Sequence, residues 1–245
     1  MHVRISENHT LRKDDIFYQP NQIEKYLTRA KNVLELGPGQ GANLGLLASK
    51  FPNIQFTGVD LYPSLARKNQ RSNIKLIKQD YHDLSQFPDD SFDVIYAIET
   101  ICHSATKDKL FDEIYRVMKK DGIFIMYDYY ASKAFEKYNT VEQKIITLIS
   151  KGCSAEILES TNCVTQKLKY AGFSKIKRED LTEKMLPDLK RLKRLASIVI
   201  HRKTFAKVVF KILPKTFLGN GVVAYVGYNA ARNRVLLYAE HIYKK

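Results

Sequence analysis

The chain has 245 residues, of which 44% are hydrophobic, and a formal net charge of +14 at pH 7. This composition excludes a wholly disordered chain and suits one large domain, or a core domain with a sizeable insert. The positive charge favours an anionic partner, which could be nucleic acid, a membrane surface or an acidic substrate. The three cysteines lack CxxC spacing and the six histidines are scattered, so we expect a reducing compartment, no disulfide framework and no metal site.

Neither a signal peptide nor a membrane-spanning helix is expected. Residues 1–10 have no basic segment followed by an apolar one, and no uninterrupted apolar run approaches the ~18 residues that a spanning helix needs. These features predict a cytoplasmic protein.

Short apolar runs alternate with helix-length amphipathic segments in the first half of the chain. The predicted strands are 32–36, 54–60, 74–78, 92–97 and 123–127, and the predicted helices are 42–51, 63–70 and 107–119. This alternation predicts parallel strands, right-handed crossovers and helices on both faces of a sheet. Because ligands bind beyond the carboxyl ends of such strands, the loops after Leu36, Val59, Gln79 and Ala97 are expected to share one crevice.

The second half of the chain has a looser pattern. We expect a helix over 164–171 that Gly172 closes, and a strand that starts at 174–176. A basic amphipathic segment follows. The last predicted elements are strands over 222–228 and 235–242.

The strongest local signal is the run ELGPGQG at 35–41, which lies between a predicted strand and a predicted helix. Gly37, Gly39 and Gly41 allow a sharp turn and a close approach of the backbone to a ligand. The amino end of the following helix supplies free N–H groups and a positive dipole, which suit a carboxylate as well as a phosphate. A glycine triplet alone does not separate NAD, FAD and S-adenosylmethionine (AdoMet).

Three further features favour AdoMet. Asp60 ends the second strand, where an acid can accept both ribose hydroxyls, although dinucleotide enzymes share this feature. Asp80 and Tyr81 follow the third strand, where a carboxylate could accept from the adenine amino group; Asp80 could equally cap a helix or a turn. The glycines have GxGxG spacing, whereas the dinucleotide fingerprint is GxGxxG.

Four segments in this order resemble the successive motifs of class I AdoMet-dependent methyltransferases. They are ELGPGQG at 35–41, VDL at 59–61, QDYHDL at 79–84 and FPDDSFDVIYAIE at 87–99. LFDEIYRVMKKDG at 110–122 is similar to the helix and turn before the family's fifth strand. The resemblance covers about residues 32–128, with weaker similarity to about residue 181. It implies an α/β, Rossmann-like, doubly wound and mostly parallel sheet with an antiparallel last strand, AdoMet as cofactor and S-adenosylhomocysteine as product.

The resemblance also implies which residues hold the cofactor. Gly37, Gly39 and Gly41 would surround its methionine part. Glu35 would help to hold its amino group, and the backbone of Ala97 and Ile98 would lie beside its sulfonium.

On the adenosine side, the resemblance implies that Asp60 binds the ribose with Leu61 beside the adenine. Asp80 and Tyr81 would contact the adenine, and Tyr18 would belong to a lid over the cofactor.

The candidate acceptor side lies just beyond the fourth strand, in YAIETICH at 96–103. This run is similar to one in sterol C-methyltransferases, and also to tocopherol-type and phosphoethanolamine methyltransferases. If the loop turns into a helix, Glu99 and His103 share one face, and the carboxylate can orient the imidazole as a general base. Alternatively, Glu99 caps a helix and His103 is a partly buried structural residue. Asp128, at the end of the fifth strand, is a second candidate acid.

Tyrosines cluster near the same strand ends. They are Tyr81, Tyr96, Tyr127, Tyr129 and Tyr130. Aromatic faces could stabilise a cation, or these rings could be ordinary core packing.

Residues 184–215 hold ten Lys or Arg and one acid, and apolar residues interleave at helical spacing. Such a helix could contact an anionic membrane, cap the acceptor pocket, or present a solvated face on a packed helix. RNA binding is a competing use of the charge, but the chain lacks an appended RNA-binding module and the Pro-Pro-Tyr/Phe run of amino-methylating nucleic-acid enzymes.

These patterns predict a single methyltransferase domain over 1–245. Its parts would be an N-terminal lid segment (1–30), an AdoMet-binding core (31–181), a basic amphipathic cap (182–221) and terminal strands (222–245). The predicted function is methyl transfer to a small, lipophilic acceptor, with possible peripheral contact to an anionic membrane. The alternatives are an RNA or protein methyltransferase, an NAD-dependent oxidoreductase, and an AdoMet-binding protein without catalysis.

Overall fold

The computed structural model describes residues 3–64, 70–201 and 215–245. Its contacts divide the chain into two compact units. The sheet unit consists of Phe17–Asp128, Thr165–Glu179 and Glu240–Lys245. The helical unit consists of Met1–Ile16, Tyr129–Val164 and Asp180–Ala239.

The sheet unit contains most of a seven-stranded sheet with the order β3-β2-β1-β4-β5-β7-β6. The strands are β1 (Asn32–Leu36), β2 (Gln55–Asp60), β3 (Ile74–Lys78), β4 (Phe92–Ile98), β5 (Met118–Ala131), β6 (Ser174–Asp180) and β7 (Leu236–Lys244). The first five strands pair with one another in parallel, and β7 is antiparallel. This order confirms the predicted Rossmann-like, mostly parallel sheet with an antiparallel last strand.

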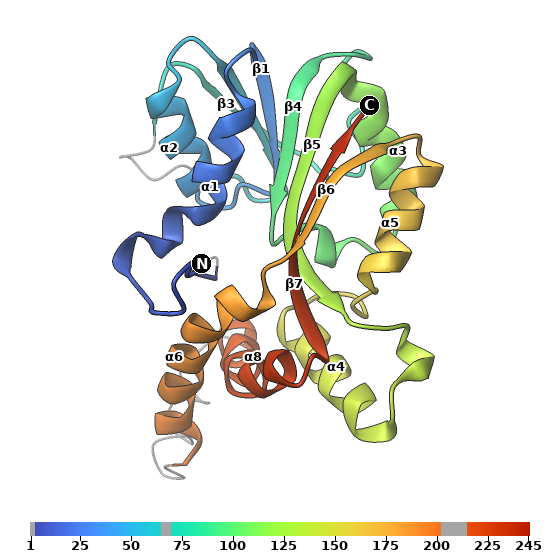
Figure 1. Cartoon of the computed structure of the whole chain (residues 1–245). Helices are drawn as coiled ribbons and strands as arrows, with labels where there is room; N and C mark the ends of the chain where they lie inside the picture. The colour runs from blue at the N-terminus through green and yellow to red at the C-terminus, as the bar shows by residue number, and fades with distance from the viewer. Residues whose placement is uncertain (1–2, 65–69, 202–214) are drawn as a thin grey trace. The chain divides into compact units, whose positions relative to one another are not determined.

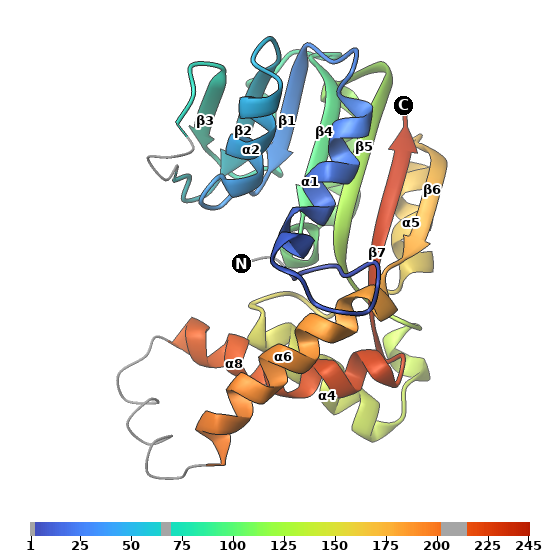
Figure 2. The same cartoon turned by 60° about the vertical axis from the view of Figure 1, so that its left-hand side comes forward.

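Helices cover both faces of this sheet (Figures 1 and 2). Helices α1 (Tyr18–Ile23) and α2 (Ala42–Lys50) lie on one face, and α3 (Lys107–Val117) and α5 (Thr161–Tyr170) lie on the other. The short 3-10 helices are η1 (Lys13–Phe17), η2 (Glu24–Tyr26), η4 (Ile101–His103) and η5 (Phe135–Lys137). The apolar stripe of α3, which includes Leu110, Phe111 and Ile114, is completely buried, as its spacing predicts.

The strand register aligns the loops that follow the central strands. Leu36, the last residue of β1, pairs with Val59 on one side and with Ala97 on the other. The loops after these three strands therefore leave the sheet at the same end of the strands. The turn at Asp121 is a bulge inside a longer β5 than expected: its φ is +64° and the pairing with β4 shifts between Phe92 and Val94.

The helical unit contains α4 (Thr140–Gly152), α6 (Thr182–Ile200) and α8 (Lys215–Arg232), and α8 packs against both of the others. Gly152 and Gly219 allow α4 and α8 to approach closely, because a Cβ on Gly152 would lie 2.8 Å from the backbone oxygen of Gly219. The asparagine that precedes α4 forms a capping box with Glu142.

The predicted strand over 222–228 is wrong, since these residues lie inside α8. The β-branched residues of this segment favour a strand locally, but the segment packs against α4 and α6 as a helix. The predicted helix over 63–70 lies largely outside the described residues. The basic amphipathic helix is confirmed up to Ile200, and its remainder also lies outside them. Within the described ranges, no helix is long and apolar enough to cross a bilayer.

Candidate cofactor and acceptor site

The glycine run after β1 forms a bend that only glycine adopts without strain. Gly37, Gly39 and Gly41 have φ values of +66°, +52° and +66°, and Gly41 is the residue that precedes α2. A Cβ on Gly37 would lie 2.2 Å from Oγ1 of Thr100, in the loop after β4. A Cβ on Gly39 would meet no atom within 4 Å, so there is open space directly beside the bend.

Asp60, at the end of β2, faces this bend. Its Oδ2 accepts a hydrogen bond from the Gly39 N–H (3.0 Å) and its Oδ1 accepts one from the Tyr62 N–H (2.8 Å). A carboxylate can accept about four hydrogen bonds, so Asp60 retains capacity for ligand hydroxyls. Leu61, beside it, is 52% exposed, which leaves an apolar surface next to the acid.

The loop after β3 is tied to the loop after β4. The Tyr81 hydroxyl donates to the backbone oxygen of Thr100 (3.1 Å). Burial, with smaller contributions that include the carboxylates of Asp128 and Asp80, raises the pKa of Tyr81 to about 12, so this hydroxyl stays protonated near neutrality. Oδ1 of Asp80 accepts from the backbone N–H of His82 (2.9 Å) and contacts its Nδ1 (2.6 Å).

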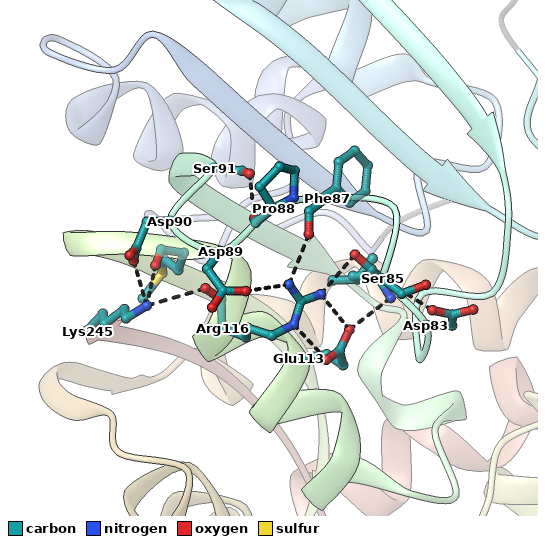
Figure 3. Close-up of polar contacts among 12 residues, drawn as sticks. Asp83, Ser85, Phe87, Pro88, Asp89, Asp90, Ser91, Glu113, Arg116 and Lys245 are labelled. Atoms are coloured by element: carbon teal, nitrogen blue, oxygen red, sulfur yellow. Dashed lines mark hydrogen bonds and ion pairs between the residues drawn. The ribbon is translucent and has the colours of Figure 1, made fainter.

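Arg116 of α3 anchors the far end of the same loop (Figure 3). Its guanidinium donates to both carboxylate oxygens of Glu113 (2.9 Å each), to the backbone oxygens of Phe87 (2.9 Å) and Leu84 (3.0 Å), and to Asp89 (2.8 Å). Hydrogen bonds from Arg116 lower the pKa of Glu113 against the opposing effect of burial. This planar, forked cation holds several acceptors that a lysine could not satisfy together.

Glu35 of β1 and Tyr96 of β4 form a buried pair in the two strands that lead to the glycine bend and the loop after β4. Glu35 is 1% exposed, and its Oε2 accepts a hydrogen bond from the Tyr96 hydroxyl (2.9 Å). Burial, and then the neighbouring carboxylate of Glu35, raises the pKa of Tyr96 well above its ordinary value. Tyr127 is also fully buried and donates to the buried carboxylate of Glu240. For these two tyrosines the structure favours core packing over the cation-stabilising alternative.

The acceptor-side loop leaves β4 through an unusual backbone conformation. Glu99 has a φ of +51°, which is uncommon for a residue with a Cβ, and its N–H donates to the backbone oxygen of Tyr127 (2.7 Å). Only Ile101–His103 form a helical turn, a 3-10 turn that excludes Glu99. The helical arrangement in which Glu99 and His103 would share one face is therefore not formed. His103 is exposed rather than partly buried.

Asp128 holds this turn from within β5, because the strand continues to Ala131, beyond its predicted end. It is 1% exposed, and its Oδ2 accepts a hydrogen bond from the buried N–H of Cys102 (2.9 Å). Among the other predicted positions, Ala97 is buried at the end of β4 and Tyr18 is 8% exposed in α1.

Comparison with known proteins identifies the core of the chain. Residues 34–126 match the family model of the methyltransferase domain. Cycloartenol-C-24-methyltransferase from Arabidopsis thaliana is 31% identical over 161 residues, which are 62% of this chain and 47% of that protein. Residues 34–126 are a class I AdoMet-dependent methyltransferase domain. The predicted family and cofactor are thereby confirmed.

Solved structures of methyltransferases share the fold across the whole chain. A putative sarcosine dimethylglycine methyltransferase from Galdieria sulphuraria has a TM-score of 0.75 at 18% identity, covering 100% of this chain and 92% of that one. Geranyl diphosphate methyltransferase, in complex with geranyl diphosphate and sinefungin, has a TM-score of 0.75 at 12% identity, covering 100% and 88%. At these identities the likeness shows the fold alone. The chain spans about half the length of the sterol methyltransferases that it matches.

The residues of the methyltransferase domain fit AdoMet. The space beside Gly39, near the amino end of α2, is open, and the Asp60 carboxylate lies next to it. Thr100 and His82, which contact the predicted positions Gly37 and Asp80, were not among the predicted site residues. Thr100 fills the space that the absent Cβ of Gly37 leaves, and a single sequence carries no signal of such a pair. His82 adjoins the predicted Asp80 and Tyr81, so its position was the available signal.

Proposed function

We propose that this chain transfers a methyl group from AdoMet to a small, lipophilic acceptor. The observation that carries the proposal is the convergence of the positive-φ bend at Gly37–Gly41 with the carboxylate of Asp60. Several matching relatives are named as sterol methyltransferases, and a protein of the same fold as a geranyl diphosphate methyltransferase, so a sterol-like or prenyl-like acceptor is the class that they support.

Each cofactor contact is assigned to a group with suitable chemistry. Gly37, Gly39 and Gly41 admit the methionine part, with Glu35 below and the Ala97 backbone beside the sulfur. When bound, AdoMet supplies a methyl group on a positively charged sulfur, which the acceptor takes by direct displacement.

Side chains that follow β2 and β3 bind the adenosine part. Asp60 accepts from the ribose hydroxyls, with Leu61 against the adenine. Asp80 and Tyr81 contact the adenine, and Tyr18 belongs to the segment that closes over the cofactor.

On the acceptor side, Glu99 and His103 orient or deprotonate the acceptor. His103 is exposed, so an acceptor can reach its imidazole, and Glu99 is half-buried with its backbone at a φ of +51°. A positioned general base typically contributes about 10²–10⁴ in rate. Asp128 acts by holding the Ile101–His103 turn in place through the Cys102 N–H.

The decisive experiment is incubation with radiolabelled AdoMet and a lipid extract of the source cells, followed by identification of the labelled product. Label in a sterol or prenyl lipid supports the proposal, and the Asp60→Ala variant should label it more slowly at the same AdoMet concentration. Label in RNA or protein would overturn the acceptor class. AdoMet binding without turnover on any acceptor would favour the non-catalytic alternative, and calorimetric binding of NADH but not AdoMet would favour an oxidoreductase.

We also propose that α6 contacts an anionic membrane, from which a lipophilic acceptor could be drawn. Within the helical unit, α6 buries Met185 and Leu189 and exposes Leu195 (52%) and Ile198 (51%). Exposed Lys190 and Arg194 flank these apolar side chains, and among the described residues neither forms an ion pair. Cations beside exposed apolar side chains suit the interface of an anionic bilayer.

Co-sedimentation with vesicles tests this contact. The protein should pellet with phosphatidylcholine vesicles that contain phosphatidylserine and remain in the supernatant with phosphatidylcholine alone. The double variant Lys190→Glu/Arg194→Glu should lose the binding, and salt should weaken it in the native protein. No pelleting with anionic vesicles at low salt would remove the proposal.

A further inference from the structure

A hydrogen-bonded chain of three side chains joins the loop after β3 to the loop after β4, within the sheet unit. Oδ1 of Asp80 lies 2.6 Å from Nδ1 of His82, and Nε2 of His82 lies 2.7 Å from Oγ of Ser104. Burial raises the pKa of Asp80, but hydrogen bonds from His82 outweigh it and the net pKa is lowered, so the carboxylate is ionised near neutrality. An ionised carboxylate only accepts, so Nδ1 carries a proton, and in the neutral imidazole Nε2 accepts from the Ser104 hydroxyl.

Asp80, His82 and Ser104 follow the order acid, imidazole, hydroxyl of a nucleophilic triad. The complete burial of Ser104, however, excludes a hydrolytic role. Ser104 is 0% exposed, so no substrate reaches its hydroxyl. Its backbone oxygen also accepts from the buried ammonium of Lys107 (2.6 Å), and its N–H donates to Ile101. Ser104 is thus the fixed end of the chain and Asp80, with a side chain that is 54% exposed, is the end open to a ligand.

We propose that His82 is a positioning residue that orients the Asp80 carboxylate for the 6-amino group of adenine and couples this orientation to Ser104. The inference rests on the proposed function, in which Asp80 contacts the adenine. His82 itself touches Asp80 and Ser104, and its role is to make one carboxylate rotamer the stable one.

The contacts of Asp80 support this role. Both the backbone N–H and the ring of His82 engage the same oxygen, Oδ1, which fixes the rotation of the carboxylate. An isolated exposed carboxylate rotates freely and selects an amino group poorly, whereas a preoriented one loses less entropy on binding. The Ser104 end keeps the imidazole from turning away from Asp80.

The coupling follows from where Ser104 lies. Ser104 ends the Ile101–His103 turn, which bears the proposed acceptor-side His103. The Tyr81 hydroxyl makes a second link to the same loop through the Thr100 oxygen. The adenine loop and the acceptor loop are therefore held as one hydrogen-bonded layer, so ordering of one loop stabilises the other.

The test measures adenine selectivity by titration calorimetry. The two ligands are S-adenosylhomocysteine and its deaminated analogue S-inosylhomocysteine, in which a carbonyl oxygen replaces the amino group. The His82→Gln side chain can reach Ser104 but loses the ring contact to Asp80, while His82→Asn can keep a donor near the position of Nδ1. We expect His82→Gln to reduce the preference for the adenosyl ligand about threefold to tenfold, and His82→Asn to retain most of it.

Two further variants complete the design. Ser104→Ala should reduce the preference in the same direction, and the double variant His82→Gln/Ser104→Ala should lose little more than the stronger single variant, because both remove one chain of contacts. Asp83→Asn is the matched control: Asp83 lies in the same loop but its carboxylate accepts from Ser85, so its substitution should leave the preference unchanged.

The outcomes separate the inference from the proposed function. A loss of affinity by the same factor for both ligands in His82→Gln and Ser104→Ala would mean a purely structural role and would overturn the inference, while leaving AdoMet binding intact. If the native protein binds neither ligand, the proposed function fails and the inference with it.

Discussion

The Asp128 carboxylate is hydrogen-bonded to the backbone of Cys102: its Oδ2 accepts a hydrogen bond from the Cys102 N–H (2.9 Å), and both residues are buried. This hydrogen bond ties β5 to the turn after β4. A second hydrogen bond joins β5 to the loop after β4: the Glu99 N–H donates to the backbone oxygen of Tyr127 at 2.7 Å. The positive φ of Glu99 persists because these bonds fix the backbone on both sides.

Asp128→Ala should remove the carboxylate acceptor of the buried Cys102 N–H, which costs about 1–3 kcal/mol in the free energy of unfolding. Asp128→Asn keeps an oxygen and should be nearly as stable. We expect turnover to fall in Asp128→Ala more than the affinity for S-adenosylhomocysteine does, because the turn carries acceptor-side residues. Urea denaturation, calorimetry and turnover measure the three quantities. An Asp128→Ala variant as stable as the native chain would contradict this positioning role.

Gly37→Ala and Gly39→Ala should separate backbone strain from steric conflict. Each places a Cβ at positive φ, which costs about 1–2 kcal/mol, but only the Cβ on Gly37 would collide with Thr100. We expect Gly37→Ala to be clearly the less stable in thermal denaturation. Both variants should weaken the binding of S-adenosylhomocysteine. The Cβ in Gly39→Ala would occupy the open space beside the bend, and the collision with Thr100 in Gly37→Ala would displace the bend itself. Unchanged affinity in Gly39→Ala would show that the ligand lies elsewhere.

Asp60→Ala should weaken the binding of S-adenosylhomocysteine by about 10- to 100-fold, because hydrogen bonds to a charged group contribute about 1.5–3 kcal/mol. Asp60→Asn should have an intermediate effect, since one oxygen remains. Asp89→Asn serves as the control, because Asp89 pairs with Arg116 and no role at the ligand is proposed for it. Titration calorimetry gives the affinities. Equal affinity in Asp60→Ala and Asp89→Asn would count against the ribose contact.

Stability should fall in acid partly through Asp93. Burial raises the pKa of Asp93, but hydrogen bonds from Lys119, Asn32 and Lys31 outweigh it and the net pKa is lowered. A carboxyl whose pKa is lower in the folded state than in the unfolded state stabilises the protein at pH values above its unfolded-state pKa of about 4. This contribution is lost as the pH falls through the folded-state pKa. In Asp93→Asn, the decline of the unfolding free energy between about pH 5 and pH 2 should be shallower. Parallel profiles for the two proteins would refute the assignment.

Arg116→Lys should lower the free energy of unfolding by about 1–2 kcal/mol, because a lysine cannot serve Glu113 and the Phe87 and Leu84 oxygens together. In a chain of this size that corresponds to a fall in Tm of roughly 2–8 °C. Arg29→Lys is the control, as Arg29 is exposed. Differential scanning fluorimetry distinguishes the two, and equal melting temperatures for both variants would contradict the anchor role of Arg116.

The segments predicted from periodicity match β1 to β4, α2 and α3 closely. Their apolar residues recur with the period of the element that buries them, so local sequence and tertiary burial agree. The run 222–228 shows the limit: it holds β-branched residues that suit a strand, yet it packs as part of α8. Burial against other helices outweighed the local preference, and no local pattern reports which neighbours a segment will have.

The sequence by itself determined the glycine bend, the acid after β2 and the strand–helix alternation, because each depends on the conformational range or the charge of a few adjacent residues. Only the tertiary structure decided that Glu99 lies outside the helical turn, and that His82 contacts Ser104 across 22 positions of the chain. Those relationships depend on which strand ends become neighbours in the sheet. The strand order and register set that adjacency, and a short stretch of sequence does not contain it.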